Sequence, residues 1–329
     1  MKLSFAQKFS LISLNSQDSL HLTTTKKVSL RCIAAAYILE LYLNHEFTIN
    51  GEVLTLTRND LEYSSITLCQ KTVLKSILGG KESLSDTLKN YLTYVIKLSN
   101  KDLKEIEHAF VDSLKEIDVL EEIPSLLGCD LEFHTSGILM KEYRSNSEIY
   151  TSLIKNIHTE ILENMSLKDE NILMLWLLHE SGCLHDIFSK ENLEKINILI
   201  NRLLQNNSCA KYFLPINIHK SIEISIKNFL TKKKKIMSTP IGSGINFVFP
   251  IFQRSQSIFI ETETFFSNKE NRLIDLKTRL EHYGHTFSVI HEGKVPVIKI
   301  DNLLYEAIPT AKQYKFPVHG VRLRKYPIS

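Results

Sequence analysis

The sequence has no apolar run long enough to form a membrane-spanning helix. Such a helix needs about 20 consecutive apolar residues, and the longest stretch, CIAAAYILELYL at residues 32–43, falls well short of that length. The first 15 residues also have too short an apolar run, and no small-residue cleavage site, for a signal peptide. These absences predict a protein of the cytoplasm that is soluble or binds a membrane peripherally.

Paired cysteines are missing as well. The chain has five cysteines, an odd number, and none belongs to a CxxC pair. They lie far apart, at Cys32, Cys69, Cys129, Cys183 and Cys209. This usage predicts reduced, mostly buried thiols in a reducing compartment and excludes a disulfide framework.

Catalytic and nucleotide-binding motifs are absent too. IGSGIN, residues 241–246, is rich in glycine but is not GxGxxG, and no strand precedes it. HTSG, residues 134–137, lacks a base and an orienting group at a readable spacing. The histidines of the C-terminal third are scattered, which favours solvated or strand-packed side chains over a site; they are His282, His285, His291 and His319. We therefore expect no enzymatic activity and no cofactor.

One polar cluster, LLHESGCLHD at residues 177–186, raises the question of a metal site. His179 and Cys183 have the i, i+4 spacing of zinc ligands on a helix. The motif is not HExxH, because Cys183 takes the place of the second histidine, and Gly182 weakens a helix between the two. The sequence favours the polar end of a buried helix over a metal site.

Most of the chain has the pattern of helices. LRCIAAAYILELYL, residues 30–43, is apolar all round, as in the centre of a bundle. Apolar residues at a 3–4 spacing then predict amphipathic helices around it, including 83–98 with Ser83 as the N-cap and 100–117. Alternation on both sides of Asn50-Gly51 predicts one hairpin, and residues 118–134 predict a second with its tip near 124–128.

Residues 231–244, TKKKKIMSTPIGSG, interrupt the helical pattern with a lysine run, a proline and two glycines. Beyond them the order ββαβββ, with turns near Gly293 and Asp301-Asn302, is typical of a small α+β domain. We predict a mainly α fold: a helical bundle with edge hairpins over 1–231, a basic linker over 232–244, and a small α+β domain over 245–329.

Positive charge is concentrated in the C-terminal third. Residues 231–329 carry a net charge of +8, and residues 1–230 carry −5. The predicted basic patch consists of the lysine run and the tail RLRK: Lys232, Lys233, Lys234, Lys235, Arg322, Arg324 and Lys325. This pattern is typical of a solvated linker, or of a surface that contacts anionic lipid or nucleic acid. Near an anionic membrane each lysine contributes about 1 kcal/mol.

Four stretches make residues 1–231 resemble the Golgi phosphoprotein 3 family: LSFAQKFSLISLN (3–15), SLRCIAAAYILELYL (29–43), SLIKNIHTEIL (152–162) and LWLLHESGCLHDIF (175–188). The resemblance implies a helical fold without catalytic residues that binds a phosphorylated inositol lipid at the cytosolic face of a membrane. It implies a headgroup site at Arg31. Where eukaryotic members place two further arginines, this chain has Lys104 and Glu107, and Lys26 and Lys27 could supplement the site.

In that family the second hairpin carries an apolar tip that dips into the membrane, which implies a wedge formed by Leu126 and Leu127. The alternative is that these leucines pack on neighbouring helices or on a second subunit. Our hypothesis is a peripheral membrane adaptor that binds acidic, phosphoinositide-like headgroups and a protein partner, with a homo-oligomer left open. The rival is a nucleic-acid-binding protein that acts through its basic C-terminal third.

Overall fold

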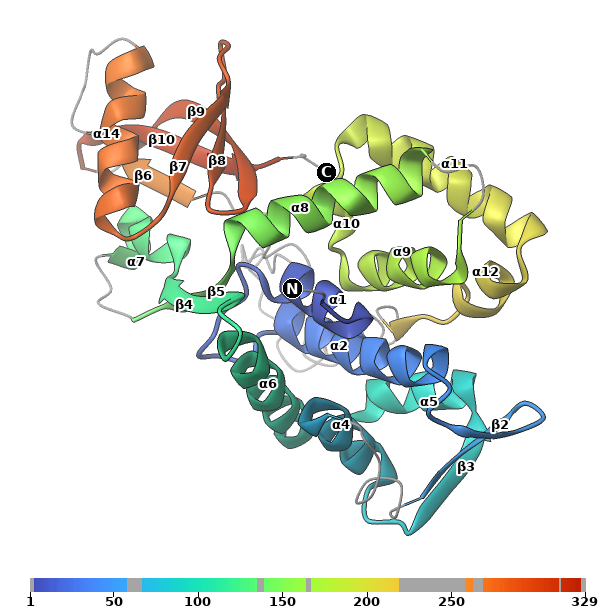
Figure 1. The fold of residues 1–329 in the computed structure, drawn as a ribbon. Helices are drawn as coiled ribbons and strands as arrows, with labels where there is room; N and C mark the ends of the chain where they lie inside the picture. Colours follow the sequence, from blue (N-terminus) through green and yellow to red (C-terminus); the bar gives the residue numbers. More distant parts are fainter. Residues whose placement is uncertain are drawn as a thin grey trace, which may run out of the picture.

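The computed structural model describes residues 3–57, 67–134, 139–163, 167–218, 258–262, 269–313 and 315–326. They form a helical N-terminal region with small β-hairpins and a C-terminal five-stranded antiparallel sheet. Figure 1 shows the sheet at one end of the molecule, next to α7 (Leu131–His134), β4 (Leu120–Pro124) and β5 (Lys141–Ser145). The paired strands β2 (Val53–Thr57) and β3 (Ser83–Thr87) lie at the opposite end. The fold is thus mixed α/β: the helical region with small hairpins agrees with the prediction, and the five-stranded sheet adds more strand than the predicted mainly α fold.

Three helices form the centre of the N-terminal region: α1 (Phe5–Leu14), α2 (Thr24–Leu43) and α9 (Asp169–Ser181). Both α1 and α9 pack against α2. The apolar residues of α2 are buried on every side of the helix, which confirms the predicted central helix. The indole of Trp176 on α9 is fully buried, and its Nε1 donates a hydrogen bond to the carbonyl oxygen of Ile216 at 3.0 Å.

Helices with one apolar face surround this centre. They are α4 (Leu68–Leu78), α5 (Leu88–Tyr94), α6 (Asn100–Lys115), α8 (Ser147–His158), α11 (Lys190–Asn206) and α12 (Ser208–Phe213). Shorter turns link them: η1 (Val95–Lys97), η2 (Leu126–Cys129), α7 (Leu131–His134), η3 (Thr159–Glu163) and α10 (Leu184–Ile187). None of the described helices is long and apolar enough to cross a bilayer.

Two small sheets flank the helices. The predicted first hairpin forms from β1 (Thr48–Asn50) and β2 (Val53–Thr57), and Gly51 in its turn has a φ of 63°. A third strand, β3 (Ser83–Thr87), pairs with β2, so Ser83 is not the predicted helix N-cap; Thr87 caps α5 instead. In the second sheet β4 (Leu120–Pro124) pairs with β5 (Lys141–Ser145). The hairpin predicted over 118–134 is therefore wrong beyond its first strand, because residues 126–134, where the return strand was expected, form the short helical segments η2 and α7.

The C-terminal sheet has the strand order β6-β10-β9-β8-β7. Its strands are β6 (Ile258–Glu261), β7 (Phe287–His291), β8 (Val297–Ile300), β9 (Leu303–Gln313) and β10 (Pro317–Lys325). The helix α14 (Lys269–His282) buries Leu276 and Leu280 in the core it shares with the sheet. The sequence pattern did not predict β10. The predicted strand at 245–252 and the linker at 232–244 lie outside the described residues.

The inner strand β10 runs close to the backbone of β6 at Gly320. A Cβ atom there would overlap the carbonyl oxygen of Ile260 and lie 2.8 Å from the ring of Phe259. We expect Gly320→Ala to cost about 1–3 kcal/mol of unfolding free energy, because β6 must move to accept the methyl group. Gly128→Ala, whose Cβ meets nothing within 4 Å, is the control for thermal unfolding. Equal thermal unfolding midpoints for Gly320→Ala and Gly128→Ala would contradict the close approach of β10 to β6 at Gly320.

Candidate functional site

Arg31 lies on α2 as a partly buried cation, and no carboxylate among the described residues pairs with it. Its Nη2 donates to the carbonyl oxygen of Leu98 at 3.3 Å. Its Nε is buried and has no hydrogen-bond partner among the residues described. Burial lowers the pKa of this guanidinium, and no nearby carboxylate offsets the effect. The fold therefore holds a positive group in a partly desolvated position and leaves most of its donors unused.

The neighbouring predicted site residues differ in availability. Lys27 lies on the same helix as Arg31, one turn earlier, and is partly buried; Lys104 is exposed on α6. The helices α2 and α6 pack on each other, and η1, whose end supplies the Leu98 carbonyl, also contacts α2. The structure thus brings the elements that carry Arg31, Lys27 and Lys104 together. Within the described residues neither lysine forms an ion pair through its side chain.

Lys26 does not present its ammonium to solvent, which corrects its assignment to the headgroup site. The side chain is 1% exposed, and its Nζ forms an ion pair with Oε1 of Glu107. Nζ also donates to the carbonyl oxygen of Ser19 at 3.3 Å, and the hydroxyl of Tyr143 donates to Glu107 at 2.7 Å. Glu107 stands where the resemblance would place an arginine, but its carboxylate is buried against the ammonium of Lys26, which neutralises its charge.

The predicted membrane wedge is also corrected. Leu126 is 4% exposed and belongs to the core of the C-terminal sheet, and Leu127 packs against that core from a partly buried position. The segment that holds them, η2, contacts β6. The side chain of Asp130 fixes this contact, because its Oδ2 accepts a hydrogen bond from the amide of Phe259 at 2.7 Å. The sheet therefore covers the leucines that were expected to enter a membrane.

The basic tail does not form one positive surface. Arg322 is exposed, but Arg324 pairs with Glu306 on β9 at 2.7 Å. Lys325 is 10% exposed and pairs with Asp186 at 2.7 Å. The lysine run, Lys232 to Lys235, lies outside the described residues. Two of the three tail cations are thus already neutralised by carboxylates.

The LLHESGCLHD segment closes helix α9. Gly182 takes a left-handed φ of 75° at its C-cap, and Cys183 is fully buried. His179 is exposed and lies 3.2 Å from Glu180, while the other carboxylate oxygen of Glu180 accepts from the amide of Ile218 at 2.7 Å. His179 therefore faces solvent and Cys183 faces the interior, so the two side chains do not form one site, as expected for the polar end of a buried helix.

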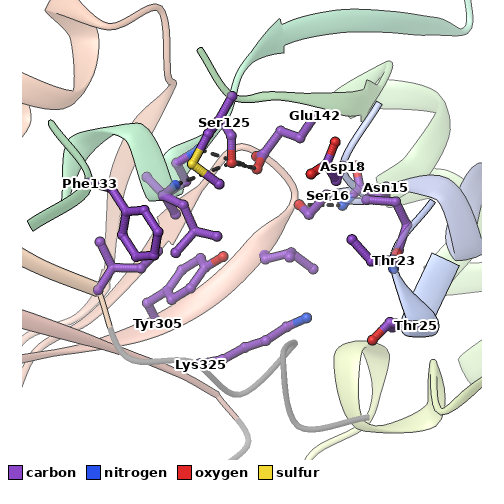
Figure 2. A pocket seen from close by; sticks show the side chains of 16 residues that line it. Asn15, Ser16, Asp18, Thr23, Thr25, Ser125, Phe133, Glu142, Tyr305 and Lys325 are labelled. Carbon is purple, nitrogen blue, oxygen red and sulfur yellow. Dashed lines mark hydrogen bonds between the residues drawn. The ribbon is translucent and has the colours of Figure 1, made fainter. Parts of the chain in front are cut away.

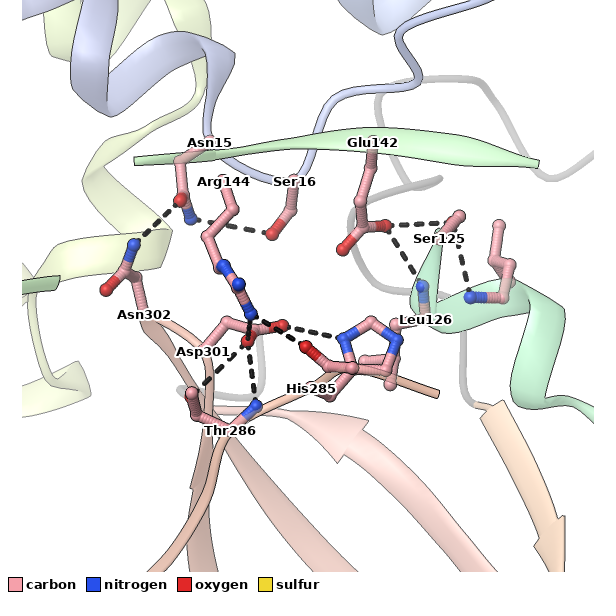
Figure 3. Close-up of polar contacts among 12 residues, drawn as sticks. Asn15, Ser16, Ser125, Leu126, Glu142, Arg144, His285, Thr286, Asp301 and Asn302 are labelled. Atoms are coloured by element: carbon pink, nitrogen blue, oxygen red, sulfur yellow. Dashed lines mark hydrogen bonds and ion pairs between the residues drawn. The ribbon is translucent and has the colours of Figure 1, made fainter. Parts of the chain in front are cut away.

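A second polar site, which the sequence did not reveal, lies where the sheet meets the helical region (Figure 3). Arg144 on β5 donates from Nη1 to Oδ1 of Asp301 and to the carbonyl oxygen of Gly284, both at 2.9 Å. His285 contacts Oδ2 of Asp301 through Nδ1 at 2.8 Å. Asn302 donates to the carbonyl oxygen of Ser145 at 2.6 Å. Side chains from both regions thus form one buried polar cluster.

Glu142, next to Arg144 along β5, completes this cluster. Its Oε2 accepts hydrogen bonds from the hydroxyl of Ser125 at 2.8 Å and from the amide of Leu126 at 3.2 Å. Burial raises the pKa of Glu142 to about 6, although the Ser125 bond and the charge of His285 act in the opposite direction. Burial also raises the pKa of Asp301, but bonds from His285, Thr286 and Arg144 outweigh it and hold that pKa below its usual value.

A cavity of about 290 Å³ opens beside Glu142 (Figure 2). Residues of the helical region, among them Asp18 and Ser125, line one side, and Tyr305 and Lys325 of the sheet line the other. Burial raises the pKa of Tyr305 well above its usual value, so its phenol stays protonated. The cavity gives solutes a route to the Glu142 side of the cluster.

Sequence reasoning had named His285 only as one of several scattered histidines and had placed Asp301 in a turn. Asp301 takes a φ of 50° there, an uncommon value for a residue other than glycine. The only local signal was therefore the turn itself. Glu142 and Arg144 are 143 and 157 positions from their partners in the C-terminal region, so no spacing rule could have connected them.

The chain matches no model in a scan of protein families, and a search of curated proteins gives no match.

Proposed function

We propose that the helical region binds a phosphorylated, anionic lipid headgroup at a membrane surface through Arg31, with Lys27 and Lys104 as supporting cations. The resemblance of residues 1–231 to the Golgi phosphoprotein 3 family motivates the proposal. One observation carries it: Arg31 is partly buried and makes no ion pair with any described carboxylate. The protein then acts as a peripheral adaptor, with a protein partner of its own.

The physical case rests on the cost of desolvating a guanidinium. A partly buried charge is normally paired, because removal from water disfavours the charged form. Arg31 uses one donor on the Leu98 carbonyl and keeps further donors for a ligand. A phosphate suits them, because its oxygens accept two parallel N–H bonds from one guanidinium. Such a ligand would supply the compensation that the described residues do not.

The basic tail gives less support to the rival hypothesis, which is nucleic-acid binding through the C-terminal third. Contact with nucleic acid depends on several cations that face phosphates together. Arg324 and Lys325 are already bound to Glu306 and Asp186, on different parts of the structure. Duplex DNA therefore serves as a comparison in the test of the proposal.

The test is flotation of the full chain with vesicles of phosphatidylcholine, alone or with a few per cent of a phosphorylated inositol lipid, at fixed salt. We expect Arg31→Glu to weaken binding by about 10-fold or more, since a charge-assisted bond contributes about 1.5–3 kcal/mol. Lys104→Glu should have a smaller effect, because an exposed lysine contributes about 1 kcal/mol near an anionic membrane.

Arg202→Glu is the matched control, because Arg202 is an exposed arginine on α11 and its reversal changes the net charge equally. Arg31→Gln removes the charge without adding a new one, and its thermal unfolding shows whether the fold is kept. If Arg31→Glu and Arg202→Glu lost equal amounts of vesicle binding, the effect would come from the net charge of the protein and not from a site at Arg31. Binding of duplex DNA but not of acidic vesicles would reject the proposal.

A further inference from the structure

We propose that Glu142, His285 and Asp301 form a binding site for one divalent first-row metal ion between the helical region and the C-terminal sheet. The inference is independent of headgroup binding at Arg31, which lies on a different part of the structure. It concerns the only group of three or more potential ligands within metal-binding distance that the described residues form.

The geometry comes first. One ligand atom from each of the three side chains lies within 4.8 Å of the other two. Glu142 is 7%, His285 2% and Asp301 7% exposed. Glu142 comes from β5, His285 precedes β7 and Asp301 follows β8, so the group bridges both regions. Figure 3 shows the imidazole between the Asp301 carboxylate and the Ser125–Leu126 segment that binds Glu142.

The imidazole has an unused nitrogen, which is a second and independent observation. Nδ1 of His285 contacts Asp301, but Nε2 is buried and no described residue bonds to it. A buried polar atom without a partner costs about 1–3 kcal/mol. In a neutral imidazole with its proton on Nδ1, Nε2 carries a lone pair, which needs a donor or a Lewis acid. Among the residues that the structure describes, the cluster is therefore one partner short.

Charge also favours a cation here. Arg144 balances one of the two carboxylates, which leaves a formal charge of −1 when His285 is neutral. Burial raises the pKa of Glu142, so the carboxylate would gain from a positive neighbour. A proton on His285 would also supply a positive charge next to Glu142. The experiment must therefore distinguish a bound metal ion from a protonated imidazole.

The ligand set identifies the class of ion. A metal ion on the free Nε2 of His285 would lie across the ring from Asp301, so the direct ligands are this nitrogen and the carboxylate of Glu142. Such a mixed set suits Zn²⁺, Mn²⁺ or Fe²⁺, whereas Mg²⁺ and Ca²⁺ prefer oxygen ligands alone. Asp301, held by Arg144 and Thr286, would orient His285 through Nδ1, and Ser125 would orient Glu142, as hydrogen-bonding groups around metal ligands commonly do. The cavity beside Glu142 provides an entry path for the ion and space for water ligands.

The experiment uses the full chain, stripped with a chelator and titrated with Zn²⁺, and measures the bound metal by elemental analysis. We expect one Zn²⁺ ion per chain in the wild type. In Glu142→Gln and in His285→Gln the affinity for Zn²⁺ should fall about 10-fold or more, since each variant loses one ligand. His179→Gln is the matched control, because it removes an exposed histidine elsewhere. Mg²⁺ should not compete with Zn²⁺.

A second measurement keeps the test valid if the ligand variants lose stability. Co²⁺ replaces Zn²⁺, and its visible absorption reports nitrogen and oxygen ligation only where a site forms. A rise in the unfolding temperature with added Zn²⁺ should appear in the wild type and be lost in Glu142→Gln. No retained metal in the wild type, or Zn²⁺ binding unchanged by both ligand variants, would overturn the proposal and leave a proton as the group that completes the cluster.

Discussion

Lys26→Met is expected to lower the free energy of unfolding by about 3–5 kcal/mol, because it leaves the Glu107 carboxylate buried without its cation. Glu107 is 7% exposed and would keep only the hydroxyl of Tyr143 as a described partner. Methionine preserves the length and apolar character of the lysine stem, so the loss reports the charge. The single tryptophan, Trp176, is buried in α9, which packs on α2, and its fluorescence follows unfolding of the helical region.

Two further variants decide the cause of this loss. Lys26→Met combined with Glu107→Gln removes both charges and keeps an acceptor for Tyr143, so we expect most of the lost stability to return. Lys27→Met, at the next position of the same helix, removes a partly buried lysine without an ion pair and should cost about 0.5 kcal/mol or less. A double variant no more stable than Lys26→Met would show that packing of the lysine stem, and not its charge, holds α2 and α6 together.

Leu126→Ala should destabilise the junction between the two regions by about 2–5 kcal/mol. Leu126 is buried in the core of the C-terminal sheet, and truncation leaves a cavity beneath β6. Hydrogen exchange at the amides of β6 and β10 measures the effect, because these strands pair in the part of the sheet nearest η2. We expect faster exchange there and little change in α9.

Leu139→Ala is the control, because Leu139 lies between β4 and β5 like Leu126 but is 68% exposed. It should shift stability by no more than about 0.5 kcal/mol. If Leu126→Ala leaves exchange in β6 unchanged but weakens vesicle binding, the leucine acts at a membrane, as the sequence first suggested, and not in the core.

Helices and turns were predictable where local patterns decide them. The all-round apolar residues of α2, the Asn50-Gly51 turn and the turn at Asp301 all appear in the structure at the expected positions. The strand β3 was missed because SLSDT begins an apolar pattern that also fits a helix. Its pairing with β2 depends on a partner about 30 residues earlier in the chain. Strand β10 was missed for the same reason, since it pairs with β6 and β9.

The availability of the candidate site residues was much less predictable. Arg31, Lys26 and Lys27 look alike in the sequence, yet one guanidinium has no carboxylate partner and one ammonium is buried against Glu107. Successive residues on a helix point in directions about 100° apart, so the neighbouring helix decides which one is covered. The same holds for Leu126, whose cover comes from strands more than 130 positions away.

The sequence by itself determined much of the local structure of this protein: where most of the helices lie, where the first hairpin turns, and that a strand-rich segment follows a basic stretch. These follow from the period of the apolar residues and from turn residues, which act over a few positions. Only the tertiary structure decided that the sheet packs on η2 and gathers Glu142, Arg144, His285 and Asp301. The reason is physical: burial and charge pairing depend on which surfaces meet, and residues so far apart leave no periodic trace of that meeting.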